Sequence, residues 1–258
     1  MSAHSVVASV RWNLNDSGLR LLSALALLVL WEAIALSGSA LLPGPATVAR
    51  ALVRDWIHGP LPSDLAITLA RVVASFLIAM VVGSVFGIVM GRSQRADGLL
   101  DLWLVLGLNV PALVIIYLCY LWIGLNEAAA VAAVALNKMP NTAVILREGA
   151  RSVDRSLLQV ADVLRLSSAR RMRRVYLPQL YPYFMAATRS GLSLIWKIVL
   201  VVELIGRSNG VGFRLGLYFQ FFDIADILAY TVTFIAVVLA VEACLIRPLE
   251  RRLTRWRA

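Results

Sequence analysis

The sequence predicts an all-α polytopic membrane protein with about six transmembrane helices, and three observations support this class. Hydrophobic residues make up 60% of the 258-residue chain, against roughly 45–50% in an ordinary soluble domain. Charged residues make up only 16%, and the mean hydropathy is +0.79. The apolar residues are gathered in six runs, each close to the length of about 20 residues that a helix needs to cross a bilayer. We therefore expect lipid surroundings and a single transmembrane domain over residues 1–258.

The predicted spans lie at roughly 19–37, 65–90, 99–123, 126–146, 182–205 and 224–246. Polar residues precede the first run without a small-residue cleavage site, which favours an uncleaved first span over a signal peptide. The turn-forming segment Leu42-Pro43-Gly44-Pro45 leads into an extracytoplasmic connection that continues to Pro60. Because the number of spans is even, both termini are expected on one side of the membrane.

The distribution of basic residues predicts which side that is. The net charge is +10. Seventeen cations fall in the N-terminal segment, 91–98, 147–180 and the segment from 247 onwards. The opposite connections hold only four, namely Arg50, Arg54, Arg207 and Arg214. Cytoplasmic loops carry the excess of cations, so both termini and the long loop are expected in the cytoplasm. The positive net charge is explained by loop cations that face anionic lipid headgroups, and no nucleic-acid partner is expected.

The loop at 147–180 is long but not disordered in composition. Asp154 is predicted to cap a helix whose apolar residues recur at helical spacing: Leu157, Val160, Ala161 and Leu164. Ser156, Gln159 and Asp162 lie on its other face. Ser167 or Ser168 then caps a second short helix, rich in arginine, which must end before Pro178. Two such helices can rest on the membrane surface or dock in a groove of a soluble partner.

The same loop carries a resemblance to a known family. Gln159-Val160-Ala161, Arg165 and Val175-Tyr176-Leu177-Pro178 follow the spacing of the EAA loop of ABC-importer permeases. That loop reads Glu-Ala-Ala, three residues, Gly, nine residues, Ile, one residue, Leu-Pro. Other fragments, in the same order and spacing, resemble the nitrate/sulfonate/taurine/bicarbonate branch of these permeases: Trp31-Glu32, Leu41-Leu42-Pro43-Gly44-Pro45, Thr68-Leu69-Ala70-Arg71, Asn109-Val110-Pro111-Ala112, Val202-Glu203-Leu204-Ile205-Gly206, Gly210-Val211-Gly212 and Leu249-Glu250-Arg251-Arg252.

The resemblance implies a type I ABC importer permease fold in a bacterial cytoplasmic (inner) membrane. It implies a second copy of the chain, two cytoplasmic ATPase subunits and an extracytoplasmic solute-binding protein as partners. The permease itself would be non-catalytic and bind no cofactor, with ATP-Mg on the ATPase. The loop at about 148–180 would hold the coupling helix, and the residues implied in ATPase coupling are Leu157, Gln159, Val160, Ala161, Asp162, Leu164, Arg165, Leu166 and Ser167.

Two positions depart from the family pattern. Arg165 stands where the family has Gly, which turns the chain with a positive φ at no steric cost. Gln159 stands where the family has Glu and so removes a charge that an ATPase cation would meet. Either the turn is made differently in this chain, or the partner ATPase is specialised to match.

Four polar residues inside the apolar runs are candidates for a translocation path, because an ionisable group within a span is costly unless it is paired or wet. They are Asn109, Lys138, Lys197 and Glu203. The lysines would give an anion a cationic lining. Alternatively, each lysine is neutralised by a carboxylate such as Glu203 or reaches water. Asn109 would offer its amide to a solute or cap a helix end.

Two expectations concern the partners of these ionisable residues. Glu203 comes six residues after Lys197, about 240° around the same helix, so each of them is expected to need a different partner. Glu32 and Arg71 are predicted to pair between the first and second spans, and the alternative is a transport role for either residue.

Other functional classes fit less well. A proton-coupled secondary transporter normally carries acids or histidines inside its spans, and this chain has few such acids and no such histidine. An enzyme needs a clustered nucleophile and base or metal ligands; Cys119, Cys244, His4 and His58 have no companions at such spacing, and no metal site is expected. The lysines favour a small anion such as a sulfonate, taurine or nitrate as solute. An uncharged pyrimidine-type solute is the alternative.

Overall fold

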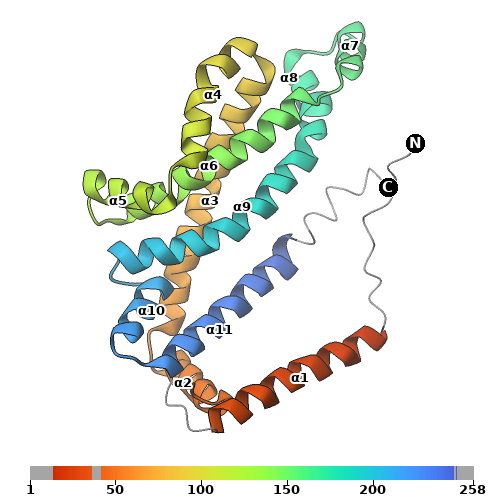
Figure 1. Ribbon diagram of the computed structural model, residues 1–258. Coiled ribbons are helices and arrows are strands. Elements are labelled where there is room, and N and C mark those ends of the chain that lie inside the picture. The colour runs from red at the N-terminus through yellow and green to blue at the C-terminus, as the bar shows by residue number, and fades with distance from the viewer. Residues whose placement is uncertain (1–13, 37–41, 247, 249–258) are drawn as a thin grey trace.

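The computed structural model describes residues 14–36, 42–246 and 248, and every regular element in these ranges is helical (Figure 1). This confirms the predicted all-α class. The helices are α1 (Leu14–Leu36), α2 (Pro45–Ile57), α3 (Leu61–Arg92), α4 (Gln94–Asn109), α5 (Ala112–Ile123), α6 (Glu127–Arg151), α7 (Arg155–Val163), α8 (Ser168–Arg171), α9 (Leu177–Gly206), α10 (Val211–Gln220) and α11 (Ile224–Val241). Two π-helical turns cover Met172–Tyr176 and Glu242–Ile246.

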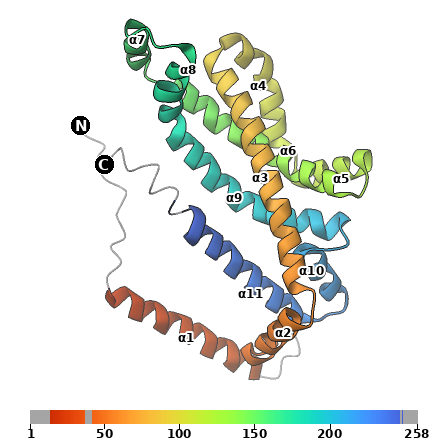
Figure 2. The ribbon, with the colours of Figure 1, turned by 180° about the vertical axis from the view of Figure 1, so that it is seen from behind.

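The long helices α3, α6 and α9 cross the middle of the molecule and separate two ends, as Figures 1 and 2 show from opposite sides. The helices α4, α7 and α8 gather at one end, called here the α7 end. The helices α2 and α10 lie at the other, called the α10 end. The two ends correspond to the loops that the cation distribution assigned to opposite sides of the membrane.

Helices α3 and α6 approach closely because glycines on α3 face α6. A Cβ at Gly87 would lie 2.3 Å from the carbonyl oxygen of Ala143, and a Cβ at Gly83 would lie 2.7 Å from that of Met139. In lipid, helices associate through close van der Waals packing rather than through a hydrophobic driving force, and small residues permit it. The spacing of Gly83, Gly87 and Gly91 therefore fixes this contact.

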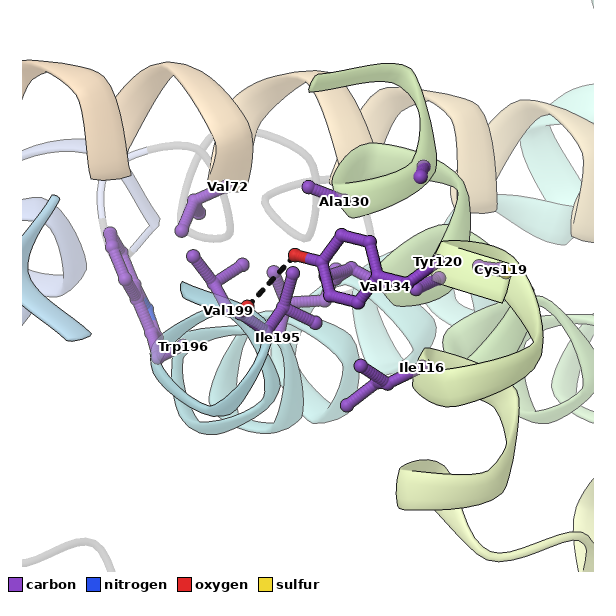
Figure 3. Close-up of a cluster of buried hydrophobic side chains, with 12 residues drawn as sticks. Val72, Ile116, Cys119, Tyr120, Ala130, Val134, Ile195, Trp196 and Val199 are labelled. Carbon is purple, nitrogen blue, oxygen red and sulfur yellow. Dashed lines mark hydrogen bonds between the residues drawn. The ribbon is translucent and has the colours of Figure 1, made fainter. Parts of the chain in front are cut away.

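A second cluster joins α3, α5, α6 and α9 (Figure 3). Val72, Ile116 and Val199 are each 1% exposed. The Tyr120 hydroxyl donates a hydrogen bond of 2.8 Å to the carbonyl oxygen of Val202. This bond satisfies the one polar atom of the ring inside an apolar site, and it fixes α5 against α9.

The predicted third span at 99–123 is wrong as a single straight helix. It is divided into α4 and α5, whose axes differ by 100°. The physical reason is Pro111, which pushes the preceding residue out of the helical region; Val110 has φ −69° and ψ 126°. Within the described ranges four helices are long and apolar enough to span a membrane, or five if the bent pair counts as one. The first span corresponds to α1, whose apolar part is Leu25–Leu36, and the total of six stays a prediction.

Helix boundaries around the long loop also differ from those predicted. The fourth span continues beyond residue 146 to Arg151. The arginine-rich helix does not end before Pro178; instead, helix runs without a break from Ser168 to Gly206. A proline ring clashes with the carbonyl of the fourth residue before it in a regular helix. The wider π-helical turn at Met172–Tyr176, immediately before the proline, lets the helix continue.

Both connections at the α10 end fold into helices rather than simple turns. The Tyr218 hydroxyl of α10 donates a hydrogen bond of 2.9 Å to Asp55 of α2. Burial and this bond to a carboxylate raise the pKa of Tyr218 to about 12. Arg54 donates to Asp226 at 2.6 Å and so ties α2 to α11.

Candidate functional site: α7 and the polar residues of the spans

The predicted cap of α7 is present. The Asp154 carboxylate accepts a hydrogen bond of 2.8 Å from the backbone N–H of Ser156 and one of 2.7 Å from its hydroxyl. These bonds favour the ionised form, and they hold the pKa of Asp154 below its usual range. The start of α7 is therefore fixed by local hydrogen bonds that the sequence itself encodes.

The end of α7 is a Schellman motif. The Arg165 N–H donates to the carbonyl of Asp162 (2.9 Å), and the Leu166 N–H donates to that of Ala161 (3.0 Å). Arg165 has φ 51°, which is the left-handed conformation that glycine adopts at no steric cost. The arginine makes this turn at the steric cost of a left-handed residue, which is about 1–2 kcal/mol.

The apolar residues of α7 are divided between two faces. Ala161 is 1% exposed, and Leu158 packs against the cluster of Val153, Tyr176 and Leu180 at the α7 end. The sequence placed Ala161 on the same face as the other apolar residues, and the structure shows it beneath the helix instead. Four apolar side chains of α7 and its C-terminal turn are exposed: Leu157 47%, Val160 54%, Val163 82% and Leu164 66%.

The polar side chains of this segment tie α7 to α8. Asp162 accepts a hydrogen bond of 2.6 Å from Nη1 of Arg171. Gln159 is exposed, and Ser167 occupies the N-cap position of α8 without a side-chain cap bond. A cleft of about 750 Å³, lined by Arg92, Asp162 and Arg171 among others, lies between this pair of helices and the end of α3. The segment is therefore held against the bundle, while its outer apolar face has no partner in the described parts of the chain.

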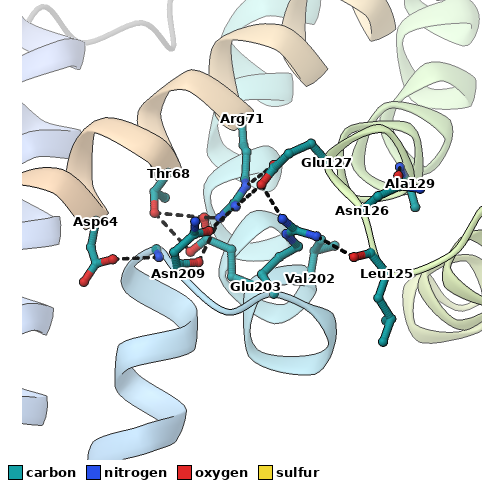
Figure 4. Close-up of polar contacts among 12 residues, drawn as sticks. Asp64, Thr68, Arg71, Leu125, Asn126, Glu127, Ala129, Val202, Glu203 and Asn209 are labelled. Carbon is teal, nitrogen blue, oxygen red and sulfur yellow. Dashed lines mark hydrogen bonds and ion pairs between the residues drawn. The ribbon is translucent and has the colours of Figure 1, made fainter.

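Arg71 of α3 stands at the centre of a buried ion network near the α10 end (Figure 4). Its side chain is 4% exposed. Nη1 lies 2.7 Å from Glu203 Oε1, and Nε donates to Glu127 at 2.8 Å. Nη1 also donates to the backbone carbonyl of Asn209 at 3.0 Å. Each of the three guanidinium nitrogens of Arg71 therefore donates to at least one acceptor.

The predicted pairing of Arg71 with Glu32 is wrong. Arg71 points toward α6 and α9, whereas Glu32 of α1 lies beside Gly44, where an added Cβ would be 3.0 Å from the Glu32 carboxylate. Sequence reasoning missed Glu127 and Asn209 as the partners. Both belong to segments far from Arg71 in the chain, so no local pattern pointed to them.

Glu203 is fully buried at 0% exposed. Besides Arg71, it accepts hydrogen bonds from the Thr68 hydroxyl (2.9 Å) and from the Gly212 N–H (2.8 Å). One turn earlier on α3, Asp64 accepts from the Gly210 N–H (2.8 Å). These contacts account for the Glu203 carboxylate without any solute, and they hold the turn between α9 and α10 against α3.

Two features of the sequence were signals for this network. Asp64, Thr68 and Arg71 recur at i, i+4 and i+7 in an otherwise apolar run, which places them on one face of a helix. Gly210 has φ 101°, and a Cβ there would lie 2.6 Å from the Glu203 carboxylate. Only glycine fits that position without strain.

The two intramembrane lysines differ in their surroundings. Lys138 of α6 is 1% exposed, and its ammonium group donates to Asn141 Oδ1 at 2.9 Å and lies 3.5 Å from Ser190 Oγ. No carboxylate in the described ranges pairs with it. Lys197 of α9 is exposed and makes no ion pair or hydrogen bond within those ranges. Glu203, proposed from the sequence as a neutralising partner, is bound to Arg71 instead.

Lys197 lines a groove of about 800 Å³ between α9 and α11. Ser190 and Ser193 of α9 line the same groove, and Trp196 and Phe234 contribute an apolar wall. Ser190 also lies 3.5 Å from the Lys138 ammonium group. Lys138 itself is buried between α6 and α9 and does not line the groove.

Asn109 lies at the last residue of α4, where its side-chain amide donates 2.7 Å to the carbonyl of Val105. The sequence left two roles open for Asn109, a contact with solute or a cap at a helix end. This hydrogen bond corresponds to the cap. The four candidates are therefore not brought together: Lys138 is buried between α6 and α9, Lys197 is exposed in the groove, and Asn109 and Glu203 have structural partners elsewhere.

A bundle of long apolar helices with a short amphipathic helix held at one end is the architecture of an integral membrane protein. The family model for the inner membrane component of binding-protein-dependent transport systems matches residues 79–253, more than half of the chain. The chain belongs to this family and is a permease subunit of an ABC importer.

Relatives and a solved structure agree with this assignment. The chain is 30% identical over 234 residues to the putative aliphatic sulfonates transport permease protein SsuC of Bacillus subtilis, covering 90% of this chain and 84% of that protein. It is 28% identical over 262 residues to the taurine transport system permease protein TauC of Escherichia coli, covering 98% and 95%. A solved structure, described as an amino acid ABC transporter with histidines, matches with a TM-score of 0.60 at 22% identity over 74% of this chain and 93% of that chain. At that identity the match shows the fold alone.

Proposed function

We propose that two copies of this chain form the pathway of an ATP-driven importer, in which α7 is the coupling helix. ATP-Mg binds and is hydrolysed on two cytoplasmic ATPase subunits, and an extracytoplasmic binding protein delivers the solute. The observation that carries the proposal is the outer face of α7, where Leu157, Val160, Val163 and Leu164 are exposed on a helix that is capped at both ends. A rigid amphipathic helix of this kind fits a hydrophobic groove on a partner.

The proposed orientation places the α7 end and both termini in the cytoplasm. The support is the excess of cations in the segments that gather at the α7 end. The α10 end, with its four cations, would then meet the binding protein. Catalysis belongs to the ATPase, and the permease contributes the path and the coupling contact.

We also propose a small anion, of the sulfonate or taurine class, as the solute. The support is the two intramembrane lysines, Lys197 exposed in a groove and Lys138 buried on α6, neither of them paired with a carboxylate of the described ranges. The names of SsuC and TauC point to solutes with the same sulfonate chemistry. An ammonium group inside a span is costly, and a passing anion offsets that cost.

The coupling proposal is tested with Leu164→Asp in proteoliposomes that contain the ATPase and the binding protein. Leu164 is exposed, so the variant is expected to insert and fold normally while an unpaired charge enters the ATPase contact, at a cost of a few kcal/mol. Solute-stimulated ATP hydrolysis and uptake should both fall. Arg155→Gln is the matched control, because it changes the net charge by the same amount on the opposite side of α7. Normal coupling in Leu164→Asp would show that α7 does not dock on the ATPase.

A further inference from the structure

Three arginines at the α7 end share one concave surface. Arg170, Arg173 and Arg174 line a pocket of about 470 Å³, called here the basic pocket. All three side chains are exposed, and none makes a hydrogen bond or ion pair within the described ranges. Their neighbour Arg171, in contrast, is paired with Asp162 at 2.6 Å. The basic pocket therefore gathers three like charges that no acid of the described chain neutralises.

The basic pocket lies where the chain enters the apolar part of a membrane-spanning helix. Arg173 and Arg174 belong to the π-helical turn that leads directly into α9, and helix continues from there to Gly206. Tyr181 follows one to two turns later and is 38% exposed. Arginines followed by an amphipathic aromatic residue are typical of the interface between headgroups and acyl chains.

We propose that the basic pocket binds the phosphate headgroup of an anionic phospholipid such as phosphatidylglycerol. Guanidinium groups form bidentate hydrogen bonds with phosphate oxygens, and three of them converging on one concavity fit a single phosphodiester with a net negative charge. Basic clusters directly cytoplasmic of a membrane span attract anionic lipids. Arg173 and Arg174 follow Arg170 by three and four residues, a spacing that places all three on one face of a helix.

A free phosphate ion offers the same oxygens but lacks an acyl chain. The lipid is favoured because Arg173 and Arg174 belong to the turn that leads directly into the membrane-spanning helix, which is where a lipid headgroup lies. An acidic surface on the ATPase is a different kind of partner. The experiment below separates these occupants.

The test is native mass spectrometry of the purified full-length protein, titrated with phosphatidylglycerol and with zwitterionic phosphatidylcholine. We expect the wild type to bind phosphatidylglycerol about tenfold more tightly than phosphatidylcholine. The triple variant Arg170→Gln, Arg173→Gln and Arg174→Gln should lose this preference. A control triple variant, Arg50→Gln, Arg95→Gln and Arg155→Gln, removes the same total charge from scattered exposed sites and should keep it.

Several outcomes would overturn the proposal. Equal affinity of the wild type for both lipids would do so, as would equal losses in the test and control variants, since net charge alone would then explain binding. Displacement of the lipid by an equal concentration of inorganic phosphate would identify a free anion as the ligand. Unchanged lipid binding with weaker ATPase association in the test variant would identify a protein contact.

A lysine version of the test variant covers the case in which the glutamine version fails to fold. Arg170→Lys, Arg173→Lys and Arg174→Lys keep the charge but lose the planar fork. We expect this variant to bind phosphatidylglycerol less tightly than the wild type does, but more tightly than the wild type binds phosphatidylcholine. Full affinity in this variant would show that charge alone is recognised and would overturn the assignment to a guanidinium pocket.

Discussion

Arg71 of α3 and Glu203 of α9 form an ion pair of 2.7 Å, with side chains 4% and 0% exposed, although 132 positions separate them in the chain. The pair joins α3 to the last turn of α9, next to the turn that begins α10. Removing one member of a buried pair leaves a charge without compensation, which costs more than the pair contributes when intact.

We therefore expect Arg71→Leu to lower the free energy of unfolding by about 3–5 kcal/mol. Glu203→Gln should cost less, because the amide can still accept hydrogen bonds from Thr68 and Gly212. The double variant Arg71→Leu with Glu203→Leu should recover part of the loss, since no buried charge of this pair then remains. Thermal unfolding in mild detergent measures the order, with Arg50→Leu as the exposed control. If the Arg71→Leu protein is as stable as the control, the ion network around Arg71 does not contribute to the free energy of unfolding.

The left-handed residue at the end of α7 gives a second prediction. Arg165→Gly removes the steric cost of φ 51°, but it adds freedom to the unfolded chain, so the net gain is about 0.5–1 kcal/mol. Arg165→Val should destabilise the turn, because a β-branched residue tolerates a positive φ poorly. Hydrogen exchange at the amide of Leu166, which closes the turn, should slow in the glycine variant and quicken in the valine variant. Identical exchange in both would contradict a strained turn at this position.

The cap of α7 gives a prediction about pH. Because hydrogen bonds lower the pKa of Asp154 in the folded protein, the cap is fully present above the ordinary pKa of an aspartate. It is lost only as the pH falls through the lowered value. The Ser156 amide should thus stay protected from exchange at pH 5 and lose protection in strong acid, below about pH 4. Asp154→Asn keeps an acceptor without a titratable group and should show no such step. A step near pH 5 or above in the wild type would be inconsistent with these contacts.

A further prediction concerns Lys197 as part of an anion path. Lys197→Met keeps the length and removes the charge, and it should slow anion uptake in proteoliposomes by about tenfold, the effect of losing one hydrogen bond to a charged group. Lys197→Arg should keep part of the activity, limited by the bulkier guanidinium. Arg95→Gln serves as the control, because it removes a cation at the α7 end. If the methionine variant transports as fast as the wild type, the lysine has no part in the path, and an uncharged solute becomes the better account.

The sequence predicted well whatever depends on local pattern. The apolar runs placed α3, α6, α9 and α11, and the spacing around Asp154 and Gln159 placed α7 with its cap. The charge distribution divided the loops into two groups that the fold places at opposite ends. These features follow from composition and from helical periodicity within one segment, so no tertiary information was needed.

What the sequence did not predict depends on contacts between segments or on an unusual turn. The partners of Arg71 come from α6, α9 and the turn before α10, and Glu32 was chosen only because its span is next in sequence. The bend at Val110 was encoded in Pro111, whose effect on the preceding residue was overlooked. Pro178 was expected to end a helix, but the helix continues through it. The π-helical turn before the proline avoids a clash between its ring and a preceding backbone carbonyl. Ala161 fell on the wrong face because periodicity alone does not tell which side of a short helix is covered.

The unbroken helix from Ser168 to Gly206 makes a mechanical link between two distant regions. Its 39 residues form a rod about 58 Å long, and a tilt of about 5° about the midpoint would displace each end by about 2–3 Å in opposite directions. Tyr176 and Leu180, near the start of the rod, pack beneath α7. Glu203, near its far end, is bonded to Arg71 and to the first turn of α10. If α7 docks on the ATPase as proposed, a push on α7 would act with leverage on the ion network at the opposite end, because the helix from Ser168 to Gly206 continues without an intervening loop.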